Sequence, residues 1–139
     1  MSADDTALLQ AAEAALRQAY ARYSGFRVGA ALLTASGNLF RGCNVESISF
    51  PIGQCAERNA IAAAVLEEGP AMRIARLLVA AEHRGSTAPC TPCGACRQAI
   101  MEFGADAIVL FRDADTGFVA VPARDLLPNT FGFGAGNKR

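Results

Sequence analysis

The sequence predicts an α/β domain in which helices cover both faces of a five-stranded mixed sheet. Apolar runs of strand length alternate with longer segments of helical period, and turns containing glycine, proline and asparagine separate them. The chain has 139 residues and is 52% hydrophobic, which suits one core and a single domain over residues 1–139. The predicted element order is α-β-β-α-β-α-β-β-α, which is typical of layered α/β domains.

The first predicted helix covers residues 6–23, where apolar side chains recur with a helical period after the capping candidates Asp5 and Thr6. Two apolar runs follow, at residues 28–34 and 39–43. The turn between them contains glycine and asparagine, so the two runs are predicted to pair as a hairpin.

The middle of the chain predicts a helix followed by a buried strand. The helix covers residues 56–67 and stops at Gly69-Pro70, because glycine and proline commonly follow the end of a helix. Residues 74–81 form a continuous apolar run, which is typical of a strand buried on both faces.

The last part of the chain predicts two helices around two strands. The helices cover residues 92–103 and 123–127, and the strands cover residues 107–111 and 118–121. A glycine-rich tail from about residue 132 is expected to be mobile.

The charge balance argues against a polyphosphate partner. Lysine plus arginine equals aspartate plus glutamate at 13 each, so the formal net charge is zero and a small free substrate is favoured over nucleic acid. The N-terminus is acidic, and no apolar run approaches the roughly 18 residues that a membrane span needs, so the protein is expected to be cytoplasmic. Five cysteines in such a chain indicate metal binding rather than disulfides.

Cys93 and Cys96 are the strongest candidates for metal ligands. Their i, i+3 spacing places two sulfurs on one side of a first helical turn, which is expected to have Thr91 as its N-cap and Pro92 as its first residue. Cys55 opens the preceding predicted helix and offers a third thiolate. Three protein ligands leave one tetrahedral position for water, which is the mark of a catalytic rather than a structural zinc.

Glu57 is the candidate for proton transfer. It lies too close to Cys55 for both to bind one ion comfortably from the same helical turn, yet it is well placed to reach a water on the metal. Cys90 offers an alternative, because it could replace one of its neighbouring cysteines as a ligand or, as a fourth ligand, close the site and make the zinc structural, although Pro92 separates it from the helical pair. Cys43 is expected to be a small buried residue.

Five ordered segments, spread over residues 20–131, form a specific pattern. They are Tyr23-Ser24-Gly25-Phe26-Arg27-Val28-Gly29-Ala30-Ala31, Gly42-Cys43-Asn44-Val45-Glu46, Cys55-Ala56-Glu57-Arg58, Pro92-Cys93-Gly94-Ala95-Cys96-Arg97-Gln98 and Leu126-Leu127-Pro128. The pattern resembles the small cytidine deaminases, the homotetrameric class with an all-cysteine zinc site. This resemblance implies a three-layer α-β-α sandwich around five strands and one zinc ion per chain. It also implies hydrolytic deamination of cytidine and deoxycytidine to uridine and deoxyuridine in pyrimidine salvage, with release of ammonia.

The resemblance also implies roles for single residues. Arg58 matches a residue that donates hydrogen bonds to the ligand sulfurs, and Asn44 and Glu46 match a pair that binds the ribose hydroxyls. Phe26 matches the aromatic residue that flanks the nucleoside pocket, and the backbone of Ala56 matches the contact to the base edge.

Phe131 matches the aromatic residue that the family lends to a neighbouring subunit, so a homotetramer with composite active sites is implied. Two positions depart from the family pattern: Ser47 stands where many relatives carry Asn, and Phe50 stands where Tyr is frequent. These departures leave open a modified cytosine nucleoside as substrate, such as one with an acylated amine or a cytosine-containing antibiotic.

Two other classes of function are also compatible with a zinc site. A polynucleotide deaminase shares the zinc chemistry, but it needs clustered basic residues and stacking aromatic residues, which zero net charge does not favour. A non-catalytic zinc-binding module would need a fourth ligand such as Cys90 and would have no use for Glu57.

Overall fold

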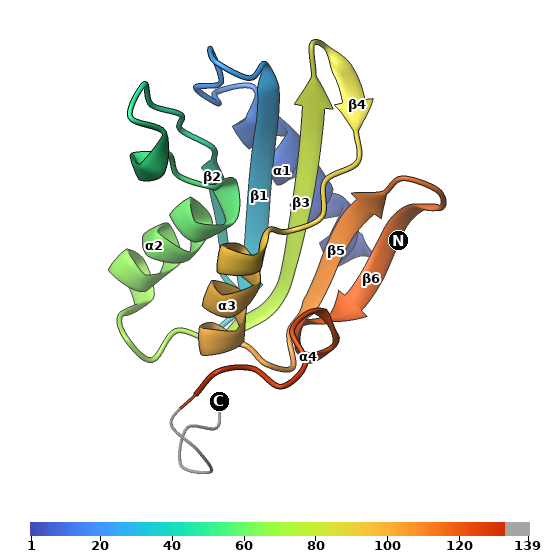
Figure 1. The fold of residues 1–139 in the computed structure, drawn as a ribbon. Helices are drawn as coiled ribbons and strands as arrows, with labels where there is room; N and C mark the ends of the chain where they lie inside the picture. Colours follow the sequence, from blue (N-terminus) through green and yellow to red (C-terminus); the bar gives the residue numbers. More distant parts are fainter. Residues whose placement is uncertain (133–139) are drawn as a thin grey trace.

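The computed structural model describes residues 1–132 (Figure 1). Its helices are α1 (Ala3–Leu16), α2 (Ala56–Glu68), α3 (Gly94–Phe103) and α4 (Ala123–Leu126), with a 3-10 turn, η1 (Phe50–Ile52), before α2. Its strands are β1 (Phe26–Thr34), β2 (Leu39–Cys43), β3 (Ile74–His83), β4 (Ser86–Ala88), β5 (Ile108–Asp113) and β6 (Gly117–Pro122). The tail that the sequence predicts to be mobile lies outside the described residues from residue 133 onward. No helix among residues 1–132 is long and apolar enough to cross a membrane.

The sheet has the strand order β2-β1-β3-β5-β6, and β4 pairs with the end of β3. β3 and β5 are parallel, whereas the other pairs of named strands are antiparallel. Figure 1 shows α1 behind this sheet and α2 and α3 in front of it. The predicted α/β sandwich around a mixed sheet is confirmed, with six strands in the described residues instead of five.

Neighbouring residues of the central strands bury their side chains on opposite faces of the sheet. Leu77 and Val109 belong to the core beneath α2 and α3, whereas Leu78 and Leu110 belong to the core beneath α1. Burying an aliphatic side chain of this size stabilises the fold by about 1.5–3 kcal/mol. Burial on both faces explains why β3 is an unbroken apolar run in the sequence.

Helix α2 lies very close to strand β2. A Cβ atom at Gly42 would lie 2.5 Å from the Ala60 nitrogen and 2.6 Å from the Ala56 carbonyl oxygen, so a larger residue cannot fit there unless the helix moves. The Asn59 side chain donates a hydrogen bond to the Cys43 carbonyl oxygen at 2.8 Å. These contacts fix the N-terminal part of α2 against the end of β2.

Helix α1 differs from its prediction at both ends. It starts at residue 3 rather than residue 6, because the Ser2 hydroxyl accepts a hydrogen bond from the Asp5 N–H at 3.1 Å and caps the helix. It ends at Leu16 rather than at residue 23. The apolar pattern continues past Leu16, but Tyr20 forms a β-bridge with Val45 in the segment after β2.

The prediction that Thr91 caps α3 and that Pro92 opens it is wrong. The helix begins at Gly94, and its N-cap is Cys93, whose backbone is extended (φ −69°, ψ 168°). The Arg97 side chain donates a hydrogen bond to the Pro92 carbonyl oxygen at 2.8 Å and holds the proline outside the helix. Strand β4 is also missing from the prediction, because its three residues become a strand only by pairing with the end of β3.

Candidate active site

Three cysteine sulfurs lie together where the N-termini of α2 and α3 meet. Cys55 is the N-cap of α2, Cys93 is the N-cap of α3, and Cys96 lies in the first turn of α3. Their Sγ atoms all lie within 4.8 Å of one another, and those of Cys55 and Cys93 are 3.9 Å apart. Two sulfurs bound to one zinc at about 2.3 Å in tetrahedral geometry lie about 3.8 Å apart. The donor set and its spacing therefore fit a zinc ion.

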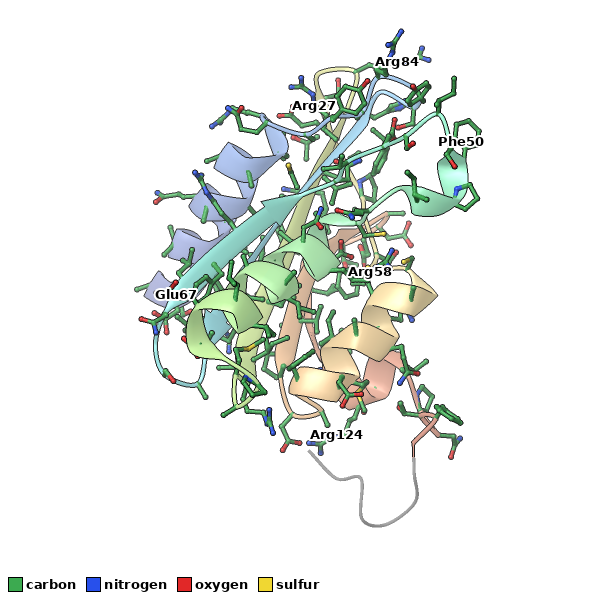
Figure 2. All side chains as sticks on the ribbon, turned by 90° about the vertical axis from the view of Figure 1, so that its left-hand side faces the viewer. Arg27, Phe50, Arg58, Glu67, Arg84 and Arg124 are labelled. Atoms are coloured by element: carbon green, nitrogen blue, oxygen red, sulfur yellow. The ribbon has the colours of Figure 1, made fainter. Side chains whose placement is uncertain are left out.

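The surroundings of Cys55 favour its thiolate form. Each helix N-terminus carries backbone N–H groups without a partner inside the helix and contributes partial positive charge. Hydrogen bonding from Cys96, reinforced by Arg58, lowers the pKa of Cys55 to about 5, and the same bond raises the pKa of Cys96. Nη2 of Arg58 lies 3.6 Å from the Cys55 sulfur, and Figure 2 shows Arg58 where the two helix ends meet. These contacts favour the thiolate form of Cys55, which is the form that binds metal.

Glu57 is a buried carboxyl group beside the sulfurs. It is the second residue of α2, and it is only 4% exposed. Burial raises the pKa of Glu57, and the negative charge of Cys55 acts in the same direction. A carboxyl group whose pKa is raised in this way can exchange protons closer to neutral pH than a surface glutamate.

A cavity of about 350 Å³ adjoins these groups. Six of the predicted site residues line it, namely Asn44, Glu46, Cys55, Ala56, Glu57 and Cys93. The cavity joins the sulfur-bearing helix ends to the segment that follows β2. Its volume lies in the range of cavities that hold small-molecule ligands.

Asn44 and Glu46 are oriented by hydrogen bonds to the chain beside them. Oδ1 of Asn44 accepts from the Val28 N–H, and Nδ2 donates to a carbonyl oxygen of β1, both at 2.9 Å. The Glu46 carboxylate accepts from the Tyr23 and Ser24 N–H groups, at 3.0 and 3.1 Å, and from the Ser24 hydroxyl. Burial acts to raise the pKa of Glu46, but these bonds outweigh it and lower the pKa. Asn44 keeps a second N–H and the carboxylate keeps acceptor sites, so both can still bind a ligand.

Two of the predicted substrate-binding residues, Phe26 and Phe131, do not line the cavity. The Phe26 ring packs against the His83 ring, with centroids 5.8 Å apart. Phe131 is 77% exposed and follows α4 near the end of the described chain. A role for either residue in ligand binding stays a prediction.

Cys90 and Thr91 also line the cavity, whereas the sequence predicted Cys90 only as an alternative metal ligand and Thr91 only as a helix cap. The Cys90 sulfur is not part of the three-sulfur group. Burial raises the pKa of Cys90 to about 12, so it stays a neutral thiol. Cys43, expected to be buried, is half-buried at the end of β2.

Arg97 is a positioning residue that was not predicted from the sequence. Its Nε donates to the Pro92 carbonyl oxygen at 2.8 Å, and its Nη1 donates to the Leu126 carbonyl oxygen at 3.0 Å. These bonds tie the turn before Cys93 to α4. The sequence feature that could have pointed to Arg97 is its position directly after Cys96 in the segment of residues 92–98.

One protein-family model, described as the cytidine and deoxycytidylate deaminase zinc-binding region, matches residues 2–112. The chain belongs to this deaminase family. The matched region contains Cys55, Cys93 and Cys96, so the group that fits a metal lies inside a zinc-binding region.

Individual cytidine deaminases are similar to the chain over most of its length. The cytidine deaminase of Halalkalibacterium halodurans is 38% identical over 129 residues, which is 92% of this chain and 94% of that protein. The cytidine deaminase of Sporosarcina psychrophila is 43% identical over 96 residues, 69% of this chain and 67% of that protein. The crystal structure of cytidine deaminase from Burkholderia pseudomallei has a TM-score of 0.80 and 40% identity, and the match covers 94% of this chain and 100% of that one.

Proposed function

We propose that the protein removes the amino group of cytidine and deoxycytidine by hydrolysis, giving uridine or deoxyuridine and ammonia. The observation that carries this proposal is the buried Glu57 carboxyl group beside a three-sulfur group, in a cavity of ligand size. Membership of the deaminase family and the similar proteins named cytidine deaminase support the reaction and the substrate. A formal net charge of zero supports a free nucleoside as substrate, with a role in pyrimidine salvage in the cytoplasm.

One zinc ion per chain would be held by Cys55, Cys93 and Cys96, which leaves one position for water. When bound, the metal supplies a water whose pKa is lowered toward neutrality. Three thiolates on Zn²⁺ carry a net negative charge, which weakens this effect. Arg58 beside Cys55 and the two helix N-termini withdraw negative charge from the sulfurs and so oppose the weakening.

Glu57 moves the protons of the reaction. Its carboxylate takes a proton from the attacking water and gives it to N3 of the cytosine ring, which makes C4 more electrophilic. The hydroxyl group adds to C4 and forms a tetrahedral carbon. Glu57 then transfers the proton of that hydroxyl to the exocyclic amine, the C4–N bond breaks, and ammonia leaves behind a C4 carbonyl. The raised pKa of Glu57 suits a group that acts as base and acid in turn.

The rest of the nucleoside would be held by Asn44, Glu46 and the start of α2. The remaining N–H of Asn44 and the acceptor sites of Glu46 complement a pair of ribose hydroxyls. The Ala56 N–H lies at the first position of α2, where it has no acceptor inside the helix, and it would donate to the O2 carbonyl of the base. Asn44 bonds the Phe26 carbonyl oxygen, which supports a place for Phe26 at the edge of the nucleoside site.

We further propose a homotetramer in which neighbouring subunits complete each active site. Ile48, Phe50 and Ile52 lie in the segment before α2 and are 82%, 74% and 66% exposed. Phe50 also lines the cavity, so this apolar cluster reaches the active site. Exposed clusters of this kind are typical of protein interfaces. Phe131 of one subunit would enter the cavity of a neighbour, which its exposure in the segment after α4 supports.

A direct assay tests the proposed reaction. Zinc-replete protein is incubated with cytidine, with deoxycytidine and with an N4-acylated cytidine, while ultraviolet absorbance and released ammonia are followed. We expect cytidine to become uridine with one ammonia per product. Turnover of the acylated compound alone would show an amide hydrolase that uses the same groups, and inactivity on all three would overturn the proposal.

A further inference from the structure

Cys90 is a cavity residue for which the proposed mechanism has no use. Its sulfur is not part of the three-sulfur group of Cys55, Cys93 and Cys96, and its neutral thiol faces the same cavity as Glu57 and Ala56. A thiol in this form behaves as a small hydrophobic side chain. The question is therefore which part of the substrate it contacts.

The orientation of the base in the proposed reaction indicates which part of the substrate Cys90 contacts. In the proposed reaction, N3 and the amine-bearing C4 would face Glu57, and N1 would carry the ribose toward Asn44 and Glu46. Two edges of the cytosine ring remain: the C2 carbonyl, which needs a hydrogen-bond donor, and the C5–C6 edge, which carries only C–H groups. The Ala56 N–H is a donor and Cys90 is a small apolar contact. The carbonyl therefore belongs with Ala56, and the C5 edge belongs with Cys90.

The fold attaches Ala56 and Cys90 to different parts of the sheet, which is consistent with this assignment. Ala56 begins α2, which packs against β2 and β1. Cys90 lies between β4 and α3, and its N–H donates to the Arg112 carbonyl oxygen of β5 at 2.9 Å. The strand order β2-β1-β3-β5 separates these two positions. Figure 1 shows α2 in front of β2 and β1, and the β4–α3 connection on the side of β3 and β5.

The wall that contains Cys90 is firmly held. The Cys90 side chain packs against the core beneath α2 and α3, and its backbone is bonded to β5. Pro89 and Pro92 flank the Cys90-Thr91 pair and restrict its backbone. Because this segment cannot easily move aside, a larger side chain at position 90 takes volume from the cavity and a smaller one adds volume.

We infer that Cys90 contacts C5 of the cytosine ring and sets the size of the substituent accepted there. This inference rests on the proposed function. It names 5-substituted cytosine nucleosides as the substrate class that Cys90 selects.

The test compares cytidine, 5-methylcytidine and 5-iodocytidine as substrates of the zinc-replete wild type, Cys90→Ala and Cys90→Leu. Relative to cytidine, we expect kcat/KM for 5-iodocytidine to rise about fivefold in Cys90→Ala, and kcat/KM for 5-methylcytidine to fall about tenfold in Cys90→Leu. Competitive inhibition by uridine and 5-methyluridine measures the same contact without turnover. Cys90→Val serves in place of Cys90→Leu if the larger side chain prevents folding.

Cys43→Ala is the matched control, because Cys43 does not line the cavity, and it should leave all these ratios unchanged. The ratio of kcat/KM for deoxycytidine to kcat/KM for cytidine should also stay constant in the Cys90 variants, since these two substrates differ only in the sugar. If kcat/KM for the 5-substituted nucleosides relative to cytidine does not change in the Cys90 variants, the inference is wrong, whereas the proposed deamination still holds. Loss of zinc from Cys90→Ala would also overturn the inference, because Cys90 would then bind the metal. Failure of the wild type to convert cytidine would overturn the proposed function, and the inference with it.

Discussion

Two properties of Glu57 act on its charge in opposite directions. It is almost fully buried, which disfavours its charge, yet it lies in the first turn of α2, where the helix dipole favours a negative group. The net result is a raised pKa. A carboxyl group in this state can both take and return a proton within one catalytic cycle.

Glu57→Gln preserves the size of the side chain and removes its proton exchange. We expect kcat for cytidine to fall by about 10²–10⁴-fold, the usual contribution of a general acid–base group. Zinc content should stay at the wild-type level, because Glu57 is not part of the sulfur group. Ultraviolet assays and metal analysis on the same preparation check both outcomes. Turnover near the wild-type rate would show that another group moves the protons.

The metal ligands give a second prediction at the residue scale. Cys55→Ala, Cys93→Ala and Cys96→Ala should each lower zinc content well below one ion per chain, because each removes one of three converging sulfurs. Cys43→Ala, which removes a cysteine outside the group, should retain the ion. The measurement is metal analysis after dialysis against a weak chelator. Full zinc retention by any of the first three variants would show a different ligand set.

Among the elements, α2 matters most for the site, because it carries Cys55 and Glu57 at its N-terminus. Its place depends on the absence of a side chain at Gly42, where the helix backbone approaches β2. A small displacement of α2 would separate Cys55 from the sulfurs of α3.

Gly42→Ala should therefore lower the free energy of unfolding by about 1–3 kcal/mol, as overpacking generally does. It should also weaken zinc retention, since α2 must shift to accept the methyl group. Gly94→Ala is the matched control, because a Cβ atom there meets nothing within 4 Å. Urea unfolding of the three proteins measures the difference. Equal stability of the two variants would show that α2 does not depend on this close approach.

Helix α1 is joined to the sheet by an ion pair between Asp5 and Arg76 of β3. The two carboxylate oxygens accept from Nε and Nη2 of Arg76 at 2.8 and 3.1 Å. Burial acts to raise the pKa of Asp5, but the hydrogen bonds from Arg76 and Ser2 outweigh it and lower the pKa. The stabilisation is therefore fully present above the unfolded pKa of about 3.9 and is lost as pH falls through the lower folded value.

Asp5→Asn should destabilise the protein by about 1 kcal/mol at pH 7, the upper end for pairs that keep some solvent contact. The difference from the wild type should shrink below pH 4 and disappear once Asp5 is protonated in the folded protein. Thermal unfolding from pH 7 to pH 3 measures this. A difference that stays constant across this range would mean that Asp5 acts through shape rather than charge.

Elements whose ends depend on their own residues were predictable from the sequence. Helix α2 begins after Cys55 and ends before Gly69 as expected, and the hairpin of β1 and β2 forms around the expected turn. Elements whose ends depend on distant partners were not. Helix α1 stops early because Tyr20 bridges to Val45, and β4 exists because β3 extends far enough to pair with it.

The same distinction applies to the site. Cysteine spacing and the start of α2 were sufficient to predict that Cys55, Cys93 and Cys96 would meet, although the predicted start of α3 was wrong, and the structure brings the three cysteines together. The cavity wall at Cys90 was not predictable, because it depends on a backbone bond to β5 that no local pattern encodes. The positions of Asn44 and Glu46 in the cavity followed from resemblance, whereas the bonds that orient them required the structure.

At the scale of the whole molecule, the candidate active site lies on the face of the sheet that α2 and α3 cover. Its cysteines and Glu57 come from α2 and α3, while α1 packs on the opposite face of the sheet. The cavity remains open beside the exposed apolar segment of residues 48–52. A neighbouring subunit placed there would cover apolar surface and close the site at once.

Hybrid assemblies test the proposed exchange of Phe131. Glu57→Gln chains lack the proton carrier, and Phe131→Ala chains lack the aromatic group offered to a neighbour. Random mixing in a co-expressed assembly should create about one complete site in every four, because the two intact residues then come from different chains. Activity near one quarter of the wild type is expected, with light scattering to confirm four chains. Activity no higher than the mean of the parents would show that Phe131 serves its own chain or none.

The separation of the two metal-binding helices along the chain also bears on how the protein is made. Cys55 precedes Cys93 by 38 residues, a stretch that includes α2, β3 and β4. At a synthesis rate of about 5–20 residues per second, Cys55 leaves the ribosome roughly 2–8 seconds before its partners. The nascent chain can therefore assemble β1, β2 and β3 before any complete metal site exists. We therefore expect zinc to be captured late in maturation, and a shortage of the metal to leave a chain whose sheet has formed without a complete metal site.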